Sequence, residues 1–229
     1  PLIELQDRSS LRCLRSVPER HTAMLLVNDQ EAQNLRFYEL DPATFQVTHK
    51  HTLGYERFLG KTDDGLSRFA LHTLRISPDF KRIAFPALQA SKPGRLHQTF
   101  YDLKLLDLET LKVAAMVEGV YVHLPMISSF SRGFPPFEWI NDEEILFQNI
   151  VADRSDKTMV LNGTHQLKIV AVKSGKIRDC LEMTGRLELN GGDLRKNPVT
   201  GRIEYQHKWI VNIKDGTLQP KDAPFSSTR

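Results

Sequence analysis

Cysteine is scarce in this sequence of 229 residues, where only Cys13 and Cys180 occur. Cysteines this far apart cannot form the CxxC motif of redox and zinc sites, and two are too few for a disulfide framework. Free cysteine usually behaves as a small buried residue, so we expect both thiols to be buried or partly buried.

Long apolar runs and an excess of one charge are also missing. No stretch approaches the roughly 18 apolar residues of a membrane-spanning helix, so no membrane span is expected. The formal net charge is only +3, with basic and acidic residues interspersed. Without a basic stripe to neutralise phosphates, nucleic acid is not an expected partner. No signal peptide is visible behind Pro1, and the compartment stays open, with the cytoplasm favoured over the periplasm or secretion.

The common catalytic motifs are absent as well. The sequence has no GxSxG, no HExxH, no P-loop and no GxGxxG, and this favours a protein that is not an enzyme. His49 and His51 are the one close pair of histidines, and strand alternation would place both on one face, where a further ligand would complete a metal site. A solvated strand surface is the favoured interpretation, so no metal and no cofactor is expected.

What the sequence does contain is a repeat. LRISPDFKRIAF at 74–85 is followed by YDLKLLDLETLKVAAM at 101–116. The same order returns with FEWINDEEILF at 137–147 and HQLKIVAVKSGKIRDC at 165–180. Weaker copies precede and follow these two. A repeat of about 60 residues indicates stacked supersecondary units.

Each copy has the composition of β-hairpins. Proline stands at the first turn position in three of the four copies, as Pro18, Pro78 and Pro198. Proline followed by a polar residue presets a type I turn, and the flanking segments are rich in Ile, Leu, Val and Phe. The adjacent Leu105 and Leu106 indicate burial on both faces of a sheet, which requires a neighbouring sheet on each side.

The combination of SPDFKRIAF, a hydrophobic hairpin with LDLET, and WINDEEILF resembles the repeats of β-propellers of the TolB-type and WD-like groups. In that family, strand one ends at a Ser-Pro-Asp-Gly-Lys turn and strand three ends in a Leu-Asp-turn-Gly hairpin. The resemblance covers most of residues 14–218, although the Gly-His and Trp-Asp signatures of WD repeats are absent. Phe80 stands where the family usually has glycine, which leaves the turn type open.

The resemblance implies an all-β fold, a β-propeller of about four antiparallel blades, with part of a larger propeller as the alternative. We expect a single propeller domain over residues 1–219 and a polar C-terminal tail at 220–229. The expected blades lie approximately at 10–53, 69–118, 135–183 and 190–219.

The predicted connections are uneven in length. Turns after strands one and three are short, whereas those after strands two and four are long, and in antiparallel blades these two sets lie on opposite faces. Long connections are uncommon without a function or disorder behind them, so the face that carries them, here the loop-rich face, is the predicted binding face. Aromatic residues and arginine commonly anchor protein interfaces. The candidate binding residues are Arg57, Lys61, Arg68, Arg95, His97, Tyr121, His123, Phe130, Arg132 and Phe134.

Three functions compete at this point. The first is a non-catalytic binding or scaffold propeller that presents its loop-rich face to a protein or peptide partner. The second is a propeller associated with a hydrolase, which resembles the gating domain of prolyl-oligopeptidase-type enzymes or a propeller hydrolase. The α/β-hydrolase portion is not in this sequence. The third is a subunit of an oligomer or a larger complex, which would account for an incomplete ring.

Overall fold

A computed structural model gives the structure of this chain. It describes residues 9–17, 22–56, 73–88, 98–123, 136–152, 162–186, 194–197, 199–205 and 208–221. These residues form sixteen strands in four antiparallel sheets of four strands each. The predicted all-β fold of about four antiparallel blades is therefore confirmed.

Each sheet is a meander, because strands that follow one another in the sequence are hydrogen-bonded neighbours. Sheet 1 contains β1 (Ser9–Val17), β2 (Thr22–Asp29), β3 (Asn34–Asp41) and β4 (Gln46–Gly54). Sheet 2 contains β5 (Arg75–Ile76), β6 (Arg82–Leu88), β7 (Gln98–Asp107) and β8 (Val113–His123). Sheet 3 contains β9 (Phe137–Trp139), β10 (Glu144–Ala152), β11 (Asn162–Ala171) and β12 (Ile177–Arg186). Sheet 4 contains β13 (Leu194–Lys196), β14 (Ile203–Tyr205), β15 (Trp209–Asn212) and β16 (Thr217–Pro220).

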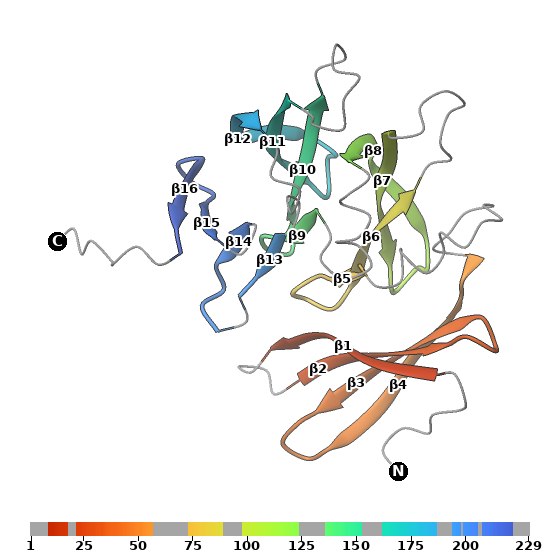
Figure 1. Cartoon of the computed structure of the whole chain (residues 1–229). Helices are drawn as coiled ribbons and strands as arrows, with labels where there is room; N and C mark the ends of the chain where they lie inside the picture. The colour runs from red at the N-terminus through yellow and green to blue at the C-terminus, as the bar shows by residue number, and fades with distance from the viewer. Residues whose placement is uncertain are drawn as a thin grey trace.

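The four sheets follow one another in an arc, with the first strand of each sheet on the inside (Figure 1). Among these inner strands, β5 contacts both β1 and β9, and β9 contacts β13. The last strand of each sheet lies on the outside of the arc (Figure 1). This radial arrangement of meanders is that of propeller blades, in which each sheet covers a face of the next.

Hydrophobic clusters fill the three seams between successive sheets. The seam between sheets 1 and 2 contains Met24, Leu26, Leu35, Phe37 and Leu53 on one side and Leu74, Ile76, Ile83, Phe85, Leu106 and Leu108 on the other. The seam between sheets 2 and 3 contains Ala84, Tyr101, Leu103, Leu105 and Val120 against Phe137, Trp139, Ile145, Phe147 and Val170. The seam between sheets 3 and 4 contains Leu146, Leu167 and Ile169 against Leu194, Ile203, Tyr205 and Val211.

The expected burial on both faces of a sheet is seen directly in β7. Leu105 belongs to the cluster between sheets 2 and 3, whereas its neighbour Leu106 belongs to the cluster between sheets 1 and 2. Successive residues of a strand point to opposite faces, so two adjacent leucines serve two different seams. The doubled apolar positions of the sequence therefore arise from the stacking of the sheets.

The turns after strand three share one backbone feature in all four sheets. In each turn the last or next-to-last residue has a positive φ, with angles of 56°, 54°, 66° and 61° at Phe45, Leu111, Gly175 and Gly216. A type I turn followed by one residue in the left-handed region joins antiparallel strands without splaying them. Sheets 3 and 4 use glycine there, whereas sheets 1 and 2 place a bulky side chain in a conformation that costs L-residues about 1–2 kcal/mol.

We expect Phe45→Gly to raise the free energy of unfolding by about 1 kcal/mol, because glycine relieves the left-handed strain. The Phe45 side chain is 63% exposed, so little packing is lost. The matched control is Gly175→Ala, which should lower the free energy of unfolding by about 1 kcal/mol, since φ is 66° and an added Cβ meets no atom within 4 Å. Urea unfolding measures both, and shifts of the same sign would contradict the strain argument.

Phe80 adopts the glycine conformation that the family pattern implies at its position. Its φ is 62°, its N–H donates to the Ser77 carbonyl at 3.0 Å, and the Ser77 N–H donates to the Arg82 carbonyl at 2.8 Å. The Phe80 side chain packs against the cluster between sheets 1 and 2. The turn type is therefore kept, and the strain of a left-handed phenylalanine is offset by what its ring fills in the seam.

Several strands extend further into the connections than the sequence indicates. Pairing between β6 and β7 continues to Leu88 and Tyr101, and β8 runs through His123 opposite Gln98. Strand β8 therefore continues beyond residue 118, near which the second blade is expected from the sequence to end. Strand length depends on the partner strand, and the pairing here leaves the shorter connections 89–97, 124–136 and 153–161.

Candidate functional site

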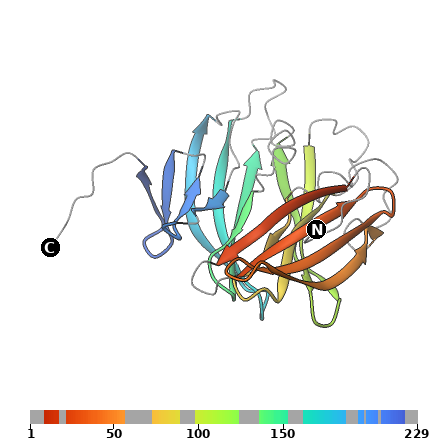
Figure 2. The same ribbon diagram turned by 90° about the horizontal axis from the view of Figure 1, so that it is seen from below.

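The two ends of the sheets differ in how their strands are connected. At one end, the connections are short and lie at 18–21, 42–45, 77–81, 108–112, 140–143, 172–176, 197–202 and 213–216. At the other end, the loop-rich face, five connections are longer and cover 55–74, 89–97, 124–136, 153–161 and 187–193, whereas 30–33 and 206–208 are short. In the side view, the tight turns of successive sheets lie together at the lower edge (Figure 2). The predicted asymmetry of the connections is therefore present, with the shorter bounds given above.

Most of the predicted binding residues lie outside the described part of the chain. Tyr121 and His123 are in β8, at the end of the strand that reaches the loop-rich face, and were expected in a connection. A role for these residues in binding stays a prediction. The predicted residues outside the described ranges are Arg57, Lys61, Arg68, Arg95, His97, Phe130, Arg132 and Phe134.

A buried polar cluster joins sheets 3 and 4 near the loop-rich face. The Gln148 side-chain amide, on β10, lies 2.6 Å from His165 Nδ1 on β11 and donates to Tyr205 Oη on β14 at 2.8 Å. Tyr205 Oη is also 3.1 Å from His165 Nδ1. All three residues are buried. The carbonyl oxygen of Gln148 finds no donor among the described residues.

The chemistry of this cluster follows from the burial of its imidazole. Burial lowers the pKa of His165 to about 4, so the ring is neutral near pH 7. A neutral ring that accepts at Nδ1 carries its proton on Nε2. The arrangement is thus a polar joint between two sheets. Sequence reasoning missed it, although Gln148 and His165 are polar interruptions of apolar strands.

A second polar group, on β13 to β16, surrounds Glu204. Directly paired residues share a face, and the register places Arg195, Glu204, Ile210 and Gln219 in one row across sheet 4. This row points away from sheet 3, because the alternate residues, such as Leu194 and Val211, lie in the seam with sheet 3. We call this surface the outer face of sheet 4.

Glu204 itself is buried and accepts several hydrogen bonds. Arg195 donates from Nε at 2.9 Å and from Nη2 at 2.7 Å, and Lys221 Nζ donates at 3.1 Å, all to Glu204 Oε2. Asn197 donates to Oε1 at 2.9 Å. Burial alone raises the pKa of Glu204, but the hydrogen bonds from Asn197, Arg195 and Lys221 and the charge of Arg195 lower it to about 2. The carboxylate is therefore charged near neutral pH.

The inner strands are tied by ionic and backbone contacts. Glu138 on β9 lies 3.5 Å from Arg75 Nε on β5 and accepts from the Lys196 backbone N–H of β13 at 3.2 Å. Lys196 Nζ donates to the Ile140 carbonyl at 2.8 Å. These contacts connect sheets 2, 3 and 4 along the inside of the arc. Their role is to hold the blades in place.

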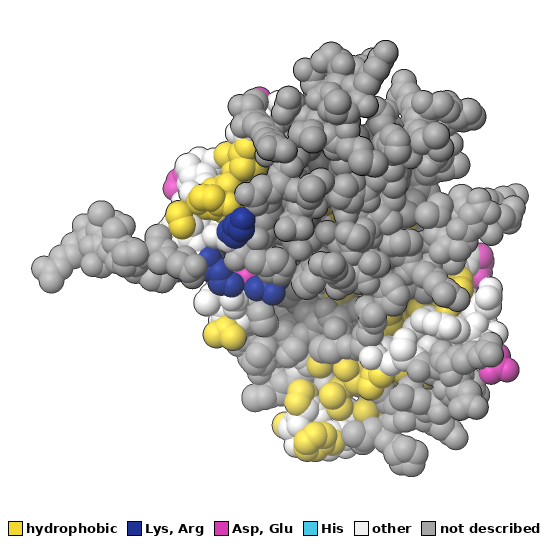
Figure 3. Space-filling view, viewed as in Figure 1, with side chains coloured by type: hydrophobic (Ala, Val, Ile, Leu, Met, Phe, Trp, Pro, Cys, Tyr) yellow, Lys and Arg dark blue, Asp and Glu magenta, His cyan; other side chains and the backbone are white. Residues whose placement is uncertain are grey.

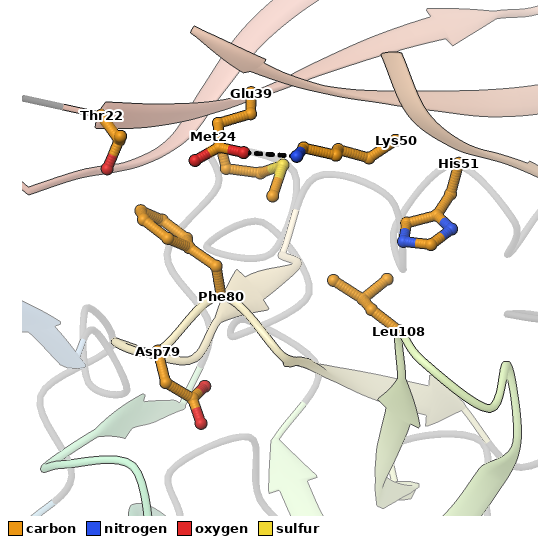
Figure 4. A pocket seen from close by; sticks show the side chains of 8 residues that line it. All are labelled: Thr22, Met24, Glu39, Lys50, His51, Asp79, Phe80 and Leu108. Carbon is orange, nitrogen blue, oxygen red and sulfur yellow. Dashed lines mark ion pairs between the residues drawn. The ribbon is translucent and has the colours of Figure 1, made fainter. Parts of the chain in front are cut away.

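A pocket of about 350 Å³ lies in the seam between sheets 1 and 2, toward the tight turns (Figure 4). Its lining consists of Thr22, Met24, Glu39, Lys50, His51, Asp79, Phe80 and Leu108. Glu39 and Lys50 form an ion pair of 2.6 Å, which neutralises both charges. Thr22 and His51 lie at opposite ends of the pocket (Figure 4), so the lining brings no hydroxyl nucleophile beside a base.

The expectation that His49 and His51 share one face is wrong. Strand β4 pairs His51 with Phe37 but His49 with Tyr38, with a register shift between the two pairs. A one-residue shift turns the following side chains to the other face. His51 therefore lines the pocket, and burial, followed by the charges of His49 and Lys50, lowers its pKa. His49 packs edge-on against the Tyr38 ring with centroids 5.3 Å apart.

Other expected features have the following outcomes. Cys180 is a free, partly buried thiol, as predicted, and burial raises its pKa while the charge of Arg178 partly offsets the rise. The side chain of Cys13 lies outside the described set.

Within the described ranges, His, Cys, Asp and Glu form no group of three suited to a metal ion. No helix in those ranges is long and apolar enough to cross a membrane.

No protein-family model and no curated protein matches this chain. Solved structures do match. A protein from Agrobacterium tumefaciens that carries the name TolB is 13% identical over 77% of this chain and 51% of its own, with a TM-score of 0.37. An oligogalacturonate lyase from Vibrio parahaemolyticus is 14% identical over 92% of this chain and 53% of its own, with a TM-score of 0.40. The propeller domain of the trilobed protease from Pyrococcus furiosus is 11% identical over 90% of this chain and 56% of its own, with a TM-score of 0.40.

This chain spans about half the length of each of these three structures. A TolB structure is among the matches, as the sequence resemblance predicted. Identities and TM-scores this low give no information about the activity of this chain. The four meandering sheets and their three seams show, in the chain itself, the architecture of a β-propeller.

Proposed function

We propose that this chain is a non-catalytic binding protein whose loop-rich face holds a protein or peptide partner. The observation that carries the proposal is the difference between the two ends of the blades. Tight turns close one end, whereas connections as long as 55–74 and 124–136 gather at the other. Rigid sheets that display long connections at one end are a common design for recognition, because the scaffold positions loops that are free to vary.

The sheets beneath this face have the rigidity that such a design requires. Three apolar seams and the buried joint of Gln148, His165 and Tyr205 fix the strands from which the connections start. Binding energy at protein interfaces is concentrated in a few aromatic and arginine residues. The predicted anchors are Arg132 and Phe134, both within the connection at 124–136.

The test is capture of a partner from an extract of the source cells by the purified chain, with identification by mass spectrometry. The double variant Arg132→Glu, Phe134→Ala should reduce the amount of captured partner about tenfold or more, as expected when interface anchors are removed. The captured protein is then purified and its affinity for both forms is measured directly.

The matched control makes the same kind of change at the tight-turn end. Lys81 and Val199 are exposed there, and Val199 is 91% exposed. The variant Lys81→Glu, Val199→Ala should capture as much partner as the unchanged chain. Equal capture by both double variants, or loss in the control alone, would show that the partner does not use the loop-rich face.

A further inference from the structure

The outer face of sheet 4 differs in character from the matching faces of the other sheets. In sheets 1, 2 and 3, hydrophobic clusters cover the face turned toward the next sheet, and in sheet 3 the buried polar joint of Gln148 and His165 lies beside them. In sheet 4, the row across the strands is Arg195, Glu204, Ile210 and Gln219, of which one is apolar. Covering this row with an apolar blade would bury charged groups, which is costly. The face is therefore suited to a polar partner.

Two cations on this face are held in place and still have donors to offer. An arginine side chain has five N–H donors and a lysine has three. Glu204 accepts two from Arg195 and one from Lys221, so each cation keeps further donors. Their side chains are 39% and 36% exposed. The buried carboxylate of Glu204 therefore holds both cations close to each other at the surface.

Among the described residues of this face, cations outnumber carboxylates. One carboxylate faces two cations, and the exposed Lys208 lies beside them, where its carbonyl accepts from the Lys221 backbone N–H at 2.8 Å. The space-filling view shows Lys and Arg side chains gathered over sheet 4, with a small acidic surface between them (Figure 3). An excess of positive charge attracts anionic groups and raises their rate of encounter.

We propose that Arg195 and Lys221 bind a carboxylate of an acidic peptide segment that lies across the outer face of sheet 4. The planar guanidinium matches the geometry of a carboxylate, and the lysine adds a second charge-assisted hydrogen bond. Ile210 and Gln219 continue the row and give apolar and amide contacts to adjoining residues of the segment. With strands about 4.8 Å apart, the row is roughly 14 Å long, which fits about four residues of extended peptide.

The test uses a fluorescently labelled, acetylated hexaglutamate peptide and fluorescence anisotropy with the full chain. We expect saturable binding that weakens as salt is added. Lys221→Gln should lower the affinity about tenfold, as expected for removal of one charged contact. Lys221→Arg keeps the charge and should stay within about twofold of the original affinity. Glu204 retains Arg195 and Asn197 in both variants, so the sheet keeps its carboxylate satisfied.

The matched control is Lys214→Gln, which removes the same charge from an exposed lysine at the tight-turn end of sheet 4. It should leave hexaglutamate binding unchanged. Absence of saturable binding, or an equal loss in Lys214→Gln, would overturn the proposal. So would displacement of the peptide by inorganic phosphate at concentrations near the peptide's own Kd, since the ligand would then be phosphate.

This site is built on sheet 4, whereas Arg132 and Phe134 lie in the connection between sheets 2 and 3, so different variants test the two proposals. The variant Arg132→Glu, Phe134→Ala should bind hexaglutamate as the unchanged chain does. If it loses the peptide while Lys221→Gln keeps it, the acidic segment binds at the loop-rich face and the outer face of sheet 4 is not its site. Retained binding in the loop variant with loss in Lys221→Gln supports the assignment.

Discussion

Replacing Trp139 by alanine is expected to lower the free energy of unfolding by about 4 kcal/mol, as is usual when a buried tryptophan is truncated. Trp139 is fully buried in the cluster between sheets 2 and 3, where it meets residues of both sheets. Its indole N–H donates to the Arg75 carbonyl at 2.9 Å, which ties β9 to β5 on the inside of the arc. The substitution therefore leaves a large cavity and removes a hydrogen bond between two sheets.

Two further variants separate the cavity from the hydrogen bond. Trp139→Phe keeps much of the apolar volume but leaves the Arg75 carbonyl without this donor, so we expect a loss of about 2 kcal/mol. Trp209→Ala makes the same truncation at a half-buried tryptophan of sheet 4 and should cost less than Trp139→Ala. Urea unfolding followed by circular dichroism measures all three. Equal losses at Trp139 and Trp209 would mean that the seam between sheets 2 and 3 is not a central support of the fold.

How far the sequence predicts this fold depends on whether a feature is local. The adjacent Leu105 and Leu106 predict burial on both faces, and the structure places them in two different seams. The proline turn at Pro78 is a local property of the backbone, and Phe80 adopts the left-handed conformation that the family pattern assigns to glycine. Periodicity and turn chemistry depend on neighbours in the sequence, so they can be recognised without the structure.

Features that depend on a partner strand could not be predicted in this way. The end of β8 at His123 is set by pairing with Gln98, and the opposite orientations of His49 and His51 result from a register shift against β3. The charged group on sheet 4 is likewise assembled from several strands, with Lys221 reaching Glu204 from beyond β16. Sequence patterns describe single strands, whereas these arrangements are properties of strand pairs and sheets.

The buried joint between sheets 3 and 4 is the clearest such case. Gln148, His165 and Tyr205 come from three strands, and Tyr205 is in a different repeat from the other two. Each alone looks like an ordinary residue of a half-buried strand. The contact among these three side chains makes stability depend on pH, because protonation of a buried neutral imidazole favours the unfolded chain.

Stability is expected to fall by about 3 kcal/mol as the pH is lowered from above 6.5 to about 4, on account of His165 alone. Burial lowers its pKa from 6.5 to about 4 in the folded chain. Between these values the unfolded chain binds the proton and the folded chain does not, so protonation favours unfolding. Below about 4 both states are protonated, and this contribution becomes constant.

Glu204 affects stability at lower pH. Its pKa is lowered from 4.5 to about 2 in the folded chain, so the stability that its ionised carboxylate contributes is lost as the pH falls through that range.

The difference between the unchanged chain and His165→Gln isolates this contribution, because other titrating groups are common to both and cancel. Glutamine keeps a side chain that can hydrogen-bond to Gln148 and Tyr205 but cannot titrate. Urea unfolding at a series of pH values should show the free energy of unfolding of the unchanged chain falling relative to that of His165→Gln as the pH drops from 6.5 to about 4. The control is His51→Gln, in the pocket between sheets 1 and 2, where the pKa is also lowered but the ring is more exposed. His51→Gln should remove a pH dependence of the free energy of unfolding that has the same sign as the one removed by His165→Gln but is smaller. If His165→Gln retained the full pH dependence of the unchanged chain, the pKa of His165 would be the same in the folded and unfolded states, and burial in the joint between sheets 3 and 4 would not lower it.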